Sequence, residues 1–310
     1  MIKKYDPPII YHRADPQIIY DGNERYYFIA TVPEFDRIEL RSAPSIEALA
    51  DACPKTVWTK SETGSTSKYI WAPEMHKVFG KWVIYFAATG NEPDENGVFD
   101  HRIYALICDG ENPFEGKYTE PIQINTGMES FSLDATVYSG RGKNYFIWAQ
   151  RDYSIPGNSN IYISEMKSPY ELAGNPVLLS KPEYEWECNG FMVNEGPAVL
   201  EHNGRLYLTY SGSATDERYA VGMLEANVNS NLLNASSWHK SICPVMKTDA
   251  SHKLYGPGHN NFFKDKNGKD YIVFHARSYA GFADKTLSDP NRNTFVWPVE
   301  YDSLDRPIFD

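Results

Sequence analysis

The sequence repeats one type of segment five times along its 310 residues: an apolar run, a turn that contains glycine, and an aromatic run. The turn glycines follow one another at intervals of 58, 62, 62 and 64 residues, at Gly22, Gly80, Gly142, Gly204 and Gly268. Each unit predicts a β-hairpin, because turns of the Asp-Gly and Asn-Gly type lie between runs rich in aromatic and β-branched residues. Antiparallel hairpins at a fixed period, with only weak helical periodicity between them, are typical of a β-propeller.

The five units use up the whole chain. We therefore predict an all-β fold, a five-bladed β-propeller with four-stranded antiparallel blades around a central channel. Length alone would suggest two domains, but the continuous repeat predicts a single domain over residues 1–310. Aromatic residues make up 14% of the chain, an excess that suits strands and sugar-binding surfaces better than helices.

Charge and hydropathy indicate which classes of partner and which cellular location to expect. Acidic residues outnumber basic ones by 41 to 30, and no run is rich in Lys or Arg, so we expect no nucleic-acid partner. No apolar run approaches the roughly 18 residues of a membrane span. No apolar segment follows Lys3 and Lys4, as a secretion signal would require. We expect a cytoplasmic protein without a membrane partner, or a secreted one if a signal has been removed; the oligomeric state stays open.

Acidic residues recur at the start of the first strand-like run in several repeats. In a propeller this strand lines the central channel, so its start lies at one mouth beside the other starts. Asp15, Asp134 and Glu195 lie 7, 8 and 9 residues before their turn glycines, and His259 lies 9 residues before its own. We therefore expect three carboxylates and one histidine, from four blades, to converge at one mouth.

Any one of these acids, taken alone, is well explained as a turn cap or a solvated side chain. A cluster is different, because like charges held close together cost free energy and shift their pKa values apart. One protonated and one ionised carboxyl group in an aromatic-lined pocket suit the hydrolysis of a glycosidic bond. The alternative is that the three acids chelate a cation.

Five short motifs, in order and at the repeat positions, carry a resemblance to a known family. They are Ala14-Asp15-Pro16, Trp71-Ala72-Pro73-Glu74, Ser132-Leu133-Asp134-Ala135, Asn194-Glu195-Gly196-Pro197 and Gly256-Pro257-Gly258-His259-Asn260. Together they resemble glycoside hydrolase family 43, and within it the exo-acting α-L-arabinofuranosidases, over nearly the whole chain. The resemblance implies a five-bladed propeller and a glycosidase that inverts the anomeric centre.

The resemblance also implies catalytic roles. Asp15 resembles the general base that activates the attacking water, and Glu195 resembles the general acid that protonates the leaving oxygen. Asp134 resembles the third acid, which orients Glu195 and tunes its pKa, since a neighbouring carboxylate favours the protonated form that a proton donor needs. Inversion implies a separation of roughly 6.5–9.5 Å between base and acid, which leaves room for a water molecule.

His259 matches the histidine that faces an ion or a water on the propeller axis in related arabinanases. It is either a ligand of a structural calcium or other cation, or a hydrogen-bonded structural residue. A single imidazole makes a poor calcium site, because calcium prefers about six to eight oxygen ligands. The chemistry itself is expected to need no cofactor.

Three further residues are candidates for sugar binding. Trp71 either stacks on the apolar face of the sugar or packs in the core. Phe131 is expected to wall the pocket. Arg277 either hydrogen-bonds sugar hydroxyls or forms a salt bridge with a catalytic acid.

The leading hypothesis is an exo-α-L-arabinofuranosidase that removes terminal arabinose, at α-1,5 linkages, from arabinan or arabino-oligosaccharides. β-Xylosidase and endo-arabinanase are alternatives within the family, since pocket shape rather than the catalytic residues separates these activities. The related retaining fructan hydrolases are a further alternative, but Ala14-Asp15-Pro16-Gln17 and Glu187-Cys188-Asn189 depart from their motifs. A sugar-binding propeller without catalysis is the non-enzyme alternative, and the presence of all three acids argues against it.

Overall fold

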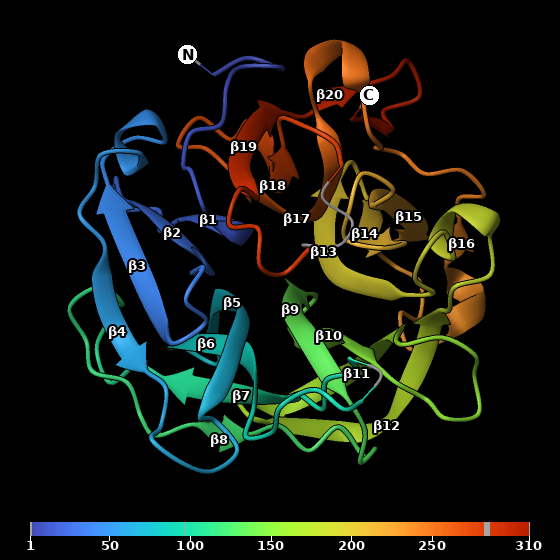
Figure 1. The fold of residues 1–310 in the computed structure, drawn as a ribbon. Coiled ribbons are helices and arrows are strands. Elements are labelled where there is room, and N and C mark those ends of the chain that lie inside the picture. Colours follow the sequence, from blue (N-terminus) through green and yellow to red (C-terminus); the bar gives the residue numbers. More distant parts are fainter. Residues whose placement is uncertain (1, 96, 282–285, 310) are drawn as a thin grey trace.

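The computed structural model describes residues 2–95, 97–281 and 286–309, and five of its sheets radiate from a common centre (Figure 1). The first blade contains β1 (Ala14–Tyr20), β2 (Tyr26–Thr31), β3 (Arg37–Ala43) and β4 (Lys55–Thr59). The second contains β5 (Lys68–Val78), β6 (Lys81–Thr89), β7 (Arg102–Ile107) and β8 (Ile122–Gln123). The third contains β9 (Ser132–Gly140), β10 (Lys143–Gln150), β11 (Asn160–Ser168) and β12 (Glu171–Ser180).

The fourth and fifth blades complete the ring. The fourth contains β13 (Asn194–His202), β14 (Arg205–Gly212), β15 (Ala220–Asn227) and β16 (His239–Lys240). The fifth contains β17 (Tyr255–Lys264), β18 (Asp270–Arg277) and β19 (Asn293–Pro298), and a short hairpin of β20 (Glu300–Tyr301) and β21 (Pro307–Ile308) follows it. The remaining regular elements are short 3-10 helices: η1 (Glu47–Leu49), η2 (Glu185–Glu187), η3 (Ala235–Ser237) and η4 (Ala250–His252).

The predicted five-bladed propeller of antiparallel strands is confirmed. The first strand of each blade is the innermost one, and these strands contact their neighbours around the ring, β1 against β5 and β17 in particular. The edge of the fifth blade is extended by the N-terminal segment, because Ile10 forms an antiparallel bridge with Thr294 of β19. The two ends of the chain therefore meet in one blade, which closes the ring.

The turn glycines sit where the repeat predicts them, between the first and second strands of the five blades. All five have a left-handed backbone, with φ between 74° and 80°. A Cβ atom at these positions would meet nothing within 4 Å, so the backbone conformation, not crowding, is what favours glycine there.

Each inner strand carries a β-bulge near its start, seen as a shift in its register against the second strand. One residue of each bulge has a left-handed backbone with φ between 43° and 55°: Asp15, Ala72, Asp134, Gly196 and His259. Bulges re-aim side chains and are common beside active sites. Asp15, Asp134 and His259 thus share one repeat position, whereas Glu195 comes one residue before the equivalent Gly196.

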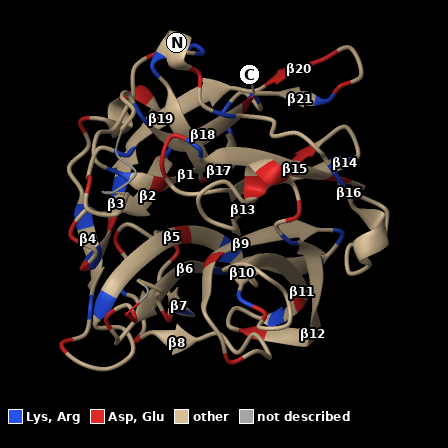
Figure 2. Ribbon diagram, turned by 45° about the vertical axis from the view of Figure 1, so that its right-hand side comes forward, with Lys and Arg blue, Asp and Glu red and all other residues tan. Residues whose placement is uncertain are grey.

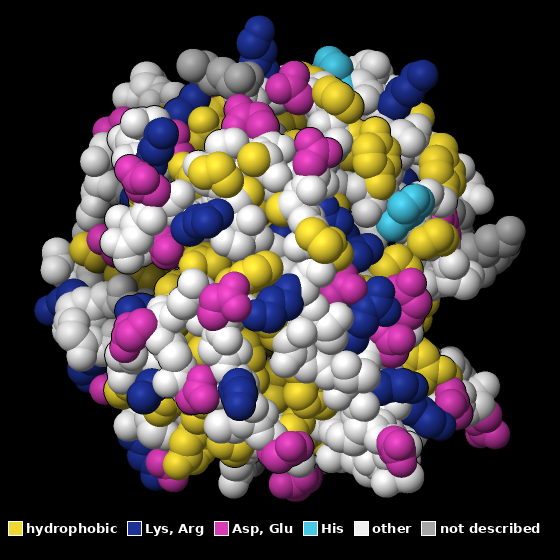
Figure 3. Space-filling model, turned by 90° about the vertical axis from the view of Figure 1, so that its left-hand side faces the viewer, with side chains coloured by type: hydrophobic (Ala, Val, Ile, Leu, Met, Phe, Trp, Pro, Cys, Tyr) yellow, Lys and Arg dark blue, Asp and Glu magenta, His cyan; other side chains and the backbone are white. Residues whose placement is uncertain are grey.

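Most of the aromatic excess packs between the blades. Large side chains that are fully buried there include Trp148, Tyr85, Tyr207, Phe146 and Phe274. Acidic and basic residues are spread over the blades (Figure 2) and intermingle on the face that Figure 3 shows. Among the described residues, no helix has both the length and the apolar character needed to cross a membrane.

Candidate active site

A cavity of about 350 Å³ opens at one mouth of the central channel. Six of the seven predicted site residues line it: Asp15, Trp71, Phe131, Asp134, Glu195 and His259. Outer loops supply the remaining wall, at residues 97–99, 190–191, 213–216, 218–219 and 286–287 among others. The volume falls in the range of small-molecule sites, so the starts of the inner strands do meet around one pocket.

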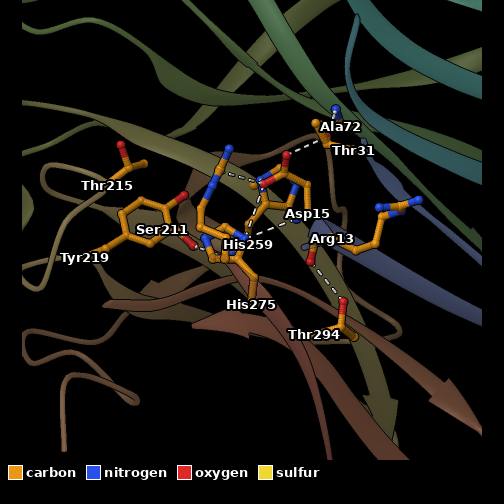
Figure 4. Close-up of polar contacts among 12 residues, drawn as sticks. Arg13, Asp15, Thr31, Ala72, Ser211, Thr215, Tyr219, His259, His275 and Thr294 are labelled. Carbon is orange, nitrogen blue, oxygen red and sulfur yellow. Dashed lines mark hydrogen bonds and ion pairs between the residues drawn. The ribbon is translucent and has the colours of Figure 1, made fainter. Parts of the chain in front are cut away.

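Asp15 is held by contacts to both of its carboxylate oxygens. The Thr31 hydroxyl donates to Oδ2 at 2.6 Å. That hydroxyl also accepts the backbone N–H of Ala72 at 2.8 Å, so its own proton is directed to the carboxylate. Nη1 of Arg292 lies 3.4 Å from Oδ1. The backbone N–H of Asp15 donates to Nδ1 of His275 at 3.1 Å (Figure 4).

These neighbours keep Asp15 ionised. Burial alone would raise the pKa of this carboxyl group, but the positive charges of His259 and Arg292 outweigh it and hold the pKa well below its usual range. An ionised carboxylate at the mouth of a pocket can accept a proton from a bound water. The environment of Asp15 is therefore that of a general base.

Glu195 has the opposite environment. Its side chain accepts one hydrogen bond, from the Tyr219 hydroxyl to Oε1 at 2.8 Å. Burial raises its pKa, and the nearby charge of Asp15 acts in the same direction. A carboxyl group that holds its proton near neutral pH can serve as a general acid, so the pKa values of Asp15 and Glu195 are separated in the sense that glycoside hydrolysis needs.

Asp134 is linked to the peptide that follows Glu195. Its Oδ2 accepts the backbone N–H of Gly196 at 2.9 Å. Burial and the charges of Glu195 and Asp15 raise the pKa of Asp134 to about 7. This contact fits the predicted orienting role, while burial, more than a neighbouring charge, accounts for the raised pKa of Glu195.

His259 lies between two of the acids, where the sequence left open a cation ligand or a structural residue. Its Nδ1 is 3.3 Å from Oδ1 of Asp15 and 3.8 Å from Oδ2 of Asp134. Burial opposes its positive charge, yet the carboxylates around it, Asp134 first, raise its pKa. The described residues place no group of three or more His, Cys, Asp or Glu side chains around a metal position. His259 thus bridges the two carboxylates, and a cation held by His259 with water as its other ligands stays a prediction.

Aromatic side chains form one wall of the cavity. Trp71 stacks on His101 with ring centroids 3.9 Å apart, and Phe99 meets the Trp71 ring edge-on at 4.7 Å. Phe131 contacts the same histidine edge-on at 6.0 Å. Trp71 and Phe131 therefore line the cavity and also pack against the residues behind it. Stacking of Trp71 on a sugar stays a prediction.

The structure does not bring Arg277 to the cavity, which corrects its predicted contact with the sugar or a catalytic acid. Arg277 ends β18 and is 1% exposed. Its guanidinium donates to the carbonyl oxygens of Thr215 and Thr286 and pairs with Asp289 at 3.2 Å. The arginine that does line the cavity is Arg292, which precedes β19.

Sequence reasoning missed three residues of the site: Thr31, Tyr219 and Arg292. Thr31 lies at the end of a second strand, where the repeat shows an aromatic run rather than a polar motif. Tyr219 and Arg292 lie in loops that precede β15 and β19, outside every repeated position. Only their contacts in the folded chain reveal them.

A buried ion pair supports the start of β13, next to Glu195. Glu187 is 0% exposed and pairs with Nζ of Lys240 at 2.8 Å. Its Oε1 also accepts the side-chain amide of Asn194 at 3.0 Å. The pair thus fixes the residue that immediately precedes the proposed acid.

Replacing Lys240 by methionine is expected to lower the free energy of unfolding by about 3–5 kcal/mol, because Glu187 then keeps a buried, uncompensated charge. The pKa of Glu187 is lowered in the fold, against the effect of burial, by Lys240 and backbone donors. Its contribution is therefore present above the unfolded pKa and lost as pH falls, so the deficit of Lys240→Met should shrink in acid. Urea denaturation at several pH values measures this.

The matched control is Lys143→Met. Lys143 forms an exposed pair with Glu165 at 2.7 Å, and its loss should cost no more than about 1 kcal/mol. Equal losses of stability in the two variants would contradict the role given to the buried pair.

Comparison with known proteins places the chain among carbohydrate-active enzymes. The sequence model of glycosyl hydrolases family 43 matches residues 5–305. An extracellular exo-α-(1→5)-L-arabinofuranosidase of Streptomyces avermitilis is 45% identical over 303 residues, which cover 97% of this chain and 62% of that protein. The protein of the same name from Streptomyces chartreusis is 45% identical over 276 residues, 89% of this chain and 83% of that one.

A solved structure agrees with these relatives. The crystal structure of an α-L-arabinofuranosidase from Lactobacillus brevis has a TM-score of 0.96 to this chain at 46% identity, and the match covers 100% of this chain and 98% of that one. The chain spans 62% of the length of the Streptomyces avermitilis relative, less than two thirds of it.

The expectation of a cytoplasmic location is contradicted by the two Streptomyces relatives, both of which are named extracellular. That expectation rested only on the missing apolar segment after Lys3 and Lys4, and such segments are removed from mature secreted proteins. The family that the motifs around Asp15, Asp134 and Glu195 resemble is confirmed, because its sequence model matches nearly the whole chain. The chain belongs to glycosyl hydrolases family 43.

Proposed function

We propose that this chain is an inverting exo-α-L-arabinofuranosidase that releases terminal arabinofuranose from α-1,5-linked arabinan or arabino-oligosaccharides. The observation that carries the proposal is the pairing, in one cavity, of Asp15, whose pKa is held low, with Glu195, whose pKa is raised. The names of the Streptomyces and Lactobacillus relatives support the choice of arabinose, and the Streptomyces names support the exo action, the 1,5 linkage and action outside the cell.

In the proposed mechanism Asp15 accepts a proton from a water molecule, and the water oxygen attacks the anomeric carbon. Glu195 gives its proton to the glycosidic oxygen as the bond between that oxygen and the anomeric carbon breaks. Asp15 thus gains one proton and Glu195 loses one, so the protons balance. Asp134 holds the backbone next to Glu195 in place. His259 offsets the negative charge of Asp15 and Asp134. The reaction uses only these side chains and water, and we propose no cofactor for it.

The proposed exo action follows the names of the two Streptomyces relatives. Loop residues 97–99, 190–191 and 286–287 line the cavity together with the starts of the inner strands. A single aromatic wall, built on Trp71 and Phe131, fits the apolar face of one sugar ring.

Two measurements test the proposal. The enzyme is expected to hydrolyse nitrophenyl α-L-arabinofuranoside with a kcat/KM about 100-fold or more above that for nitrophenyl β-D-xylopyranoside, since pocket contacts discriminate the two rings. Linear arabino-oligosaccharides should release only arabinose at early times. Exclusive hydrolysis of the xyloside would overturn the assignment to arabinose, and early release of mixed oligosaccharides would overturn exo action.

A further inference from the structure

We propose that Tyr219 is a positioning residue, which fixes the carboxyl group of Glu195 and decides which of its two oxygens carries the acidic proton. The inference rests on the proposed function, in which Glu195 is the general acid. Tyr219 immediately precedes β15, lines the cavity and is 1% exposed. Among the described residues, it is the side chain that hydrogen-bonds the Glu195 carboxyl group, with its hydroxyl 2.8 Å from Oε1.

The direction of this hydrogen bond is fixed by the environment of the phenol. Burial raises the pKa of Tyr219 well above its usual value, and the nearby charges of Glu195 and Asp134 act in the same direction. The hydroxyl therefore keeps its proton and donates it to Oε1. When Glu195 is protonated its own proton is left on Oε2, the oxygen that remains free to meet the glycosidic oxygen.

The Tyr219 ring is also coupled to the proposed base. It lies parallel to the His275 ring, with centroids 5.8 Å apart and an interplanar angle of 2°. The imidazole accepts the backbone N–H of Asp15 through Nδ1 at 3.1 Å. Burial lowers the pKa of His275 to about 3, so the ring is neutral and can accept this bond. The stacked rings of Tyr219 and His275 (Figure 4) thus hold Glu195 through the Tyr219 hydroxyl and Asp15 through the His275 imidazole.

The glycine-rich motif of the fifth blade makes room for this ring. A Cβ atom at Gly258 would lie 2.2 Å from Cε1 of Tyr219, closer than any packed carbon can come. Gly258 directly precedes His259, whose backbone N–H donates to the Ser211 hydroxyl at 2.8 Å. The motif that places His259 therefore also shapes the seat of Tyr219, which explains a glycine that the sequence alone left without a role.

The variant Tyr219→Phe tests the proposal through its dependence on the leaving group. Hydrolysis of an arabino-oligosaccharide needs a proton from Glu195, whereas a dinitrophenyl arabinofuranoside has a leaving group that departs without one. We expect kcat/KM to fall roughly 10- to 100-fold on the oligosaccharide, the effect of losing one hydrogen bond to a charged or reacting carboxyl group. On the dinitrophenyl substrate the loss should stay below about threefold.

The pH profile gives a second reading that a merely structural role would not move. The Tyr219 hydrogen bond lowers the pKa of Glu195 because it stabilises the ionised carboxylate. Its removal should raise that pKa, and the alkaline limb of kcat/KM on the oligosaccharide should shift to higher pH. Equal losses on both substrates, an unchanged oligosaccharide rate, or an unmoved alkaline limb would each overturn the proposal.

The control is Tyr85→Phe, which removes another buried hydroxyl, bonded to the carbonyl oxygen of Pro169 at 2.6 Å outside the cavity lining. It should leave both rates within about threefold of the wild type. If Tyr219→Phe fails to fold, Gly258→Ala tests the proposal instead, because it displaces the same ring. Its kcat/KM must then fall on the oligosaccharide and stay nearly unchanged on the dinitrophenyl substrate. A wild type inactive on both substrates would instead refute the proposed function, and that outcome is distinct from an active wild type with an unaffected variant.

Discussion

Asp15→Asn is expected to hydrolyse arabinofuranosides about 100- to 10,000-fold more slowly than the wild type, the usual contribution of a positioned general base. The amide keeps the shape of the carboxyl group and can still accept the Thr31 hydroxyl, so the fold of the site should persist. What the variant loses is the negative charge that accepts a proton from water. Because water must be activated whatever the leaving group, the oligosaccharide and the dinitrophenyl substrate should slow together in measured kcat.

The matched control for this prediction lies at the other end of the same strand. Asp21 follows β1, and its Oδ1 accepts the backbone N–H groups of Asn23 and Arg25 in the hairpin turn. Asp21→Asn can still accept those bonds and should leave kcat unchanged within about twofold. A fully active Asp15→Asn with a normal circular dichroism spectrum would remove Asp15 from the mechanism.

Glu195→Gln is expected to slow hydrolysis of the arabino-oligosaccharide much more than hydrolysis of the dinitrophenyl arabinofuranoside. Hydrolysis of the oligosaccharide should fall about 100- to 10,000-fold, since the amide cannot protonate the leaving oxygen. The rate of hydrolysis of the dinitrophenyl substrate should fall far less. The wild type should lose activity as pH rises through the raised pKa of Glu195, because the acid must hold its proton. The alkaline limb of kcat/KM should therefore disappear in the variant.

Glu201→Gln is the control for this second prediction. Glu201 lies on the same strand, β13, near the end away from the cavity, and accepts the Tyr138 hydroxyl at 2.9 Å. It should keep the wild-type rate and pH profile. A Glu195→Gln enzyme that slows equally on both substrates would show that Glu195 is not the proton donor.

The fold was predictable from the sequence because its constraint is periodic. A glycine with a left-handed backbone closes each hairpin, and such turns leave a local signal that a repeat multiplies five times. The same period predicted that Asp15 and Asp134 meet, since they share one repeat position. The bulge beside them was not predictable, because it follows from the shift in pairing with the second strand and has no fixed residue type.

The non-periodic half of the site lay beyond sequence reasoning. Tyr219 and Arg292 reach the cavity from loops whose path is set by tertiary packing. Arg277 failed as a prediction for the same reason. It follows the aromatic run of β18, as a mouth residue should, but Thr286 and Asp289 lie over that strand end and hold its guanidinium. Residues on the inner strands were therefore predictable, and residues that depend on how the loops fold over them were not.

The central claim is that Asp15 delivers water to the face of the sugar opposite the proton donor, Glu195. Proton NMR of the first product released from an α-L-arabinofuranoside tests this most directly, before the free sugar can mutarotate. The account predicts β-L-arabinofuranose as the first product, followed by mutarotation to the other anomeric and ring forms. Initial release of the α anomer would mean retention through a covalent intermediate, and would contradict the assignment of Asp15 as a base acting on water.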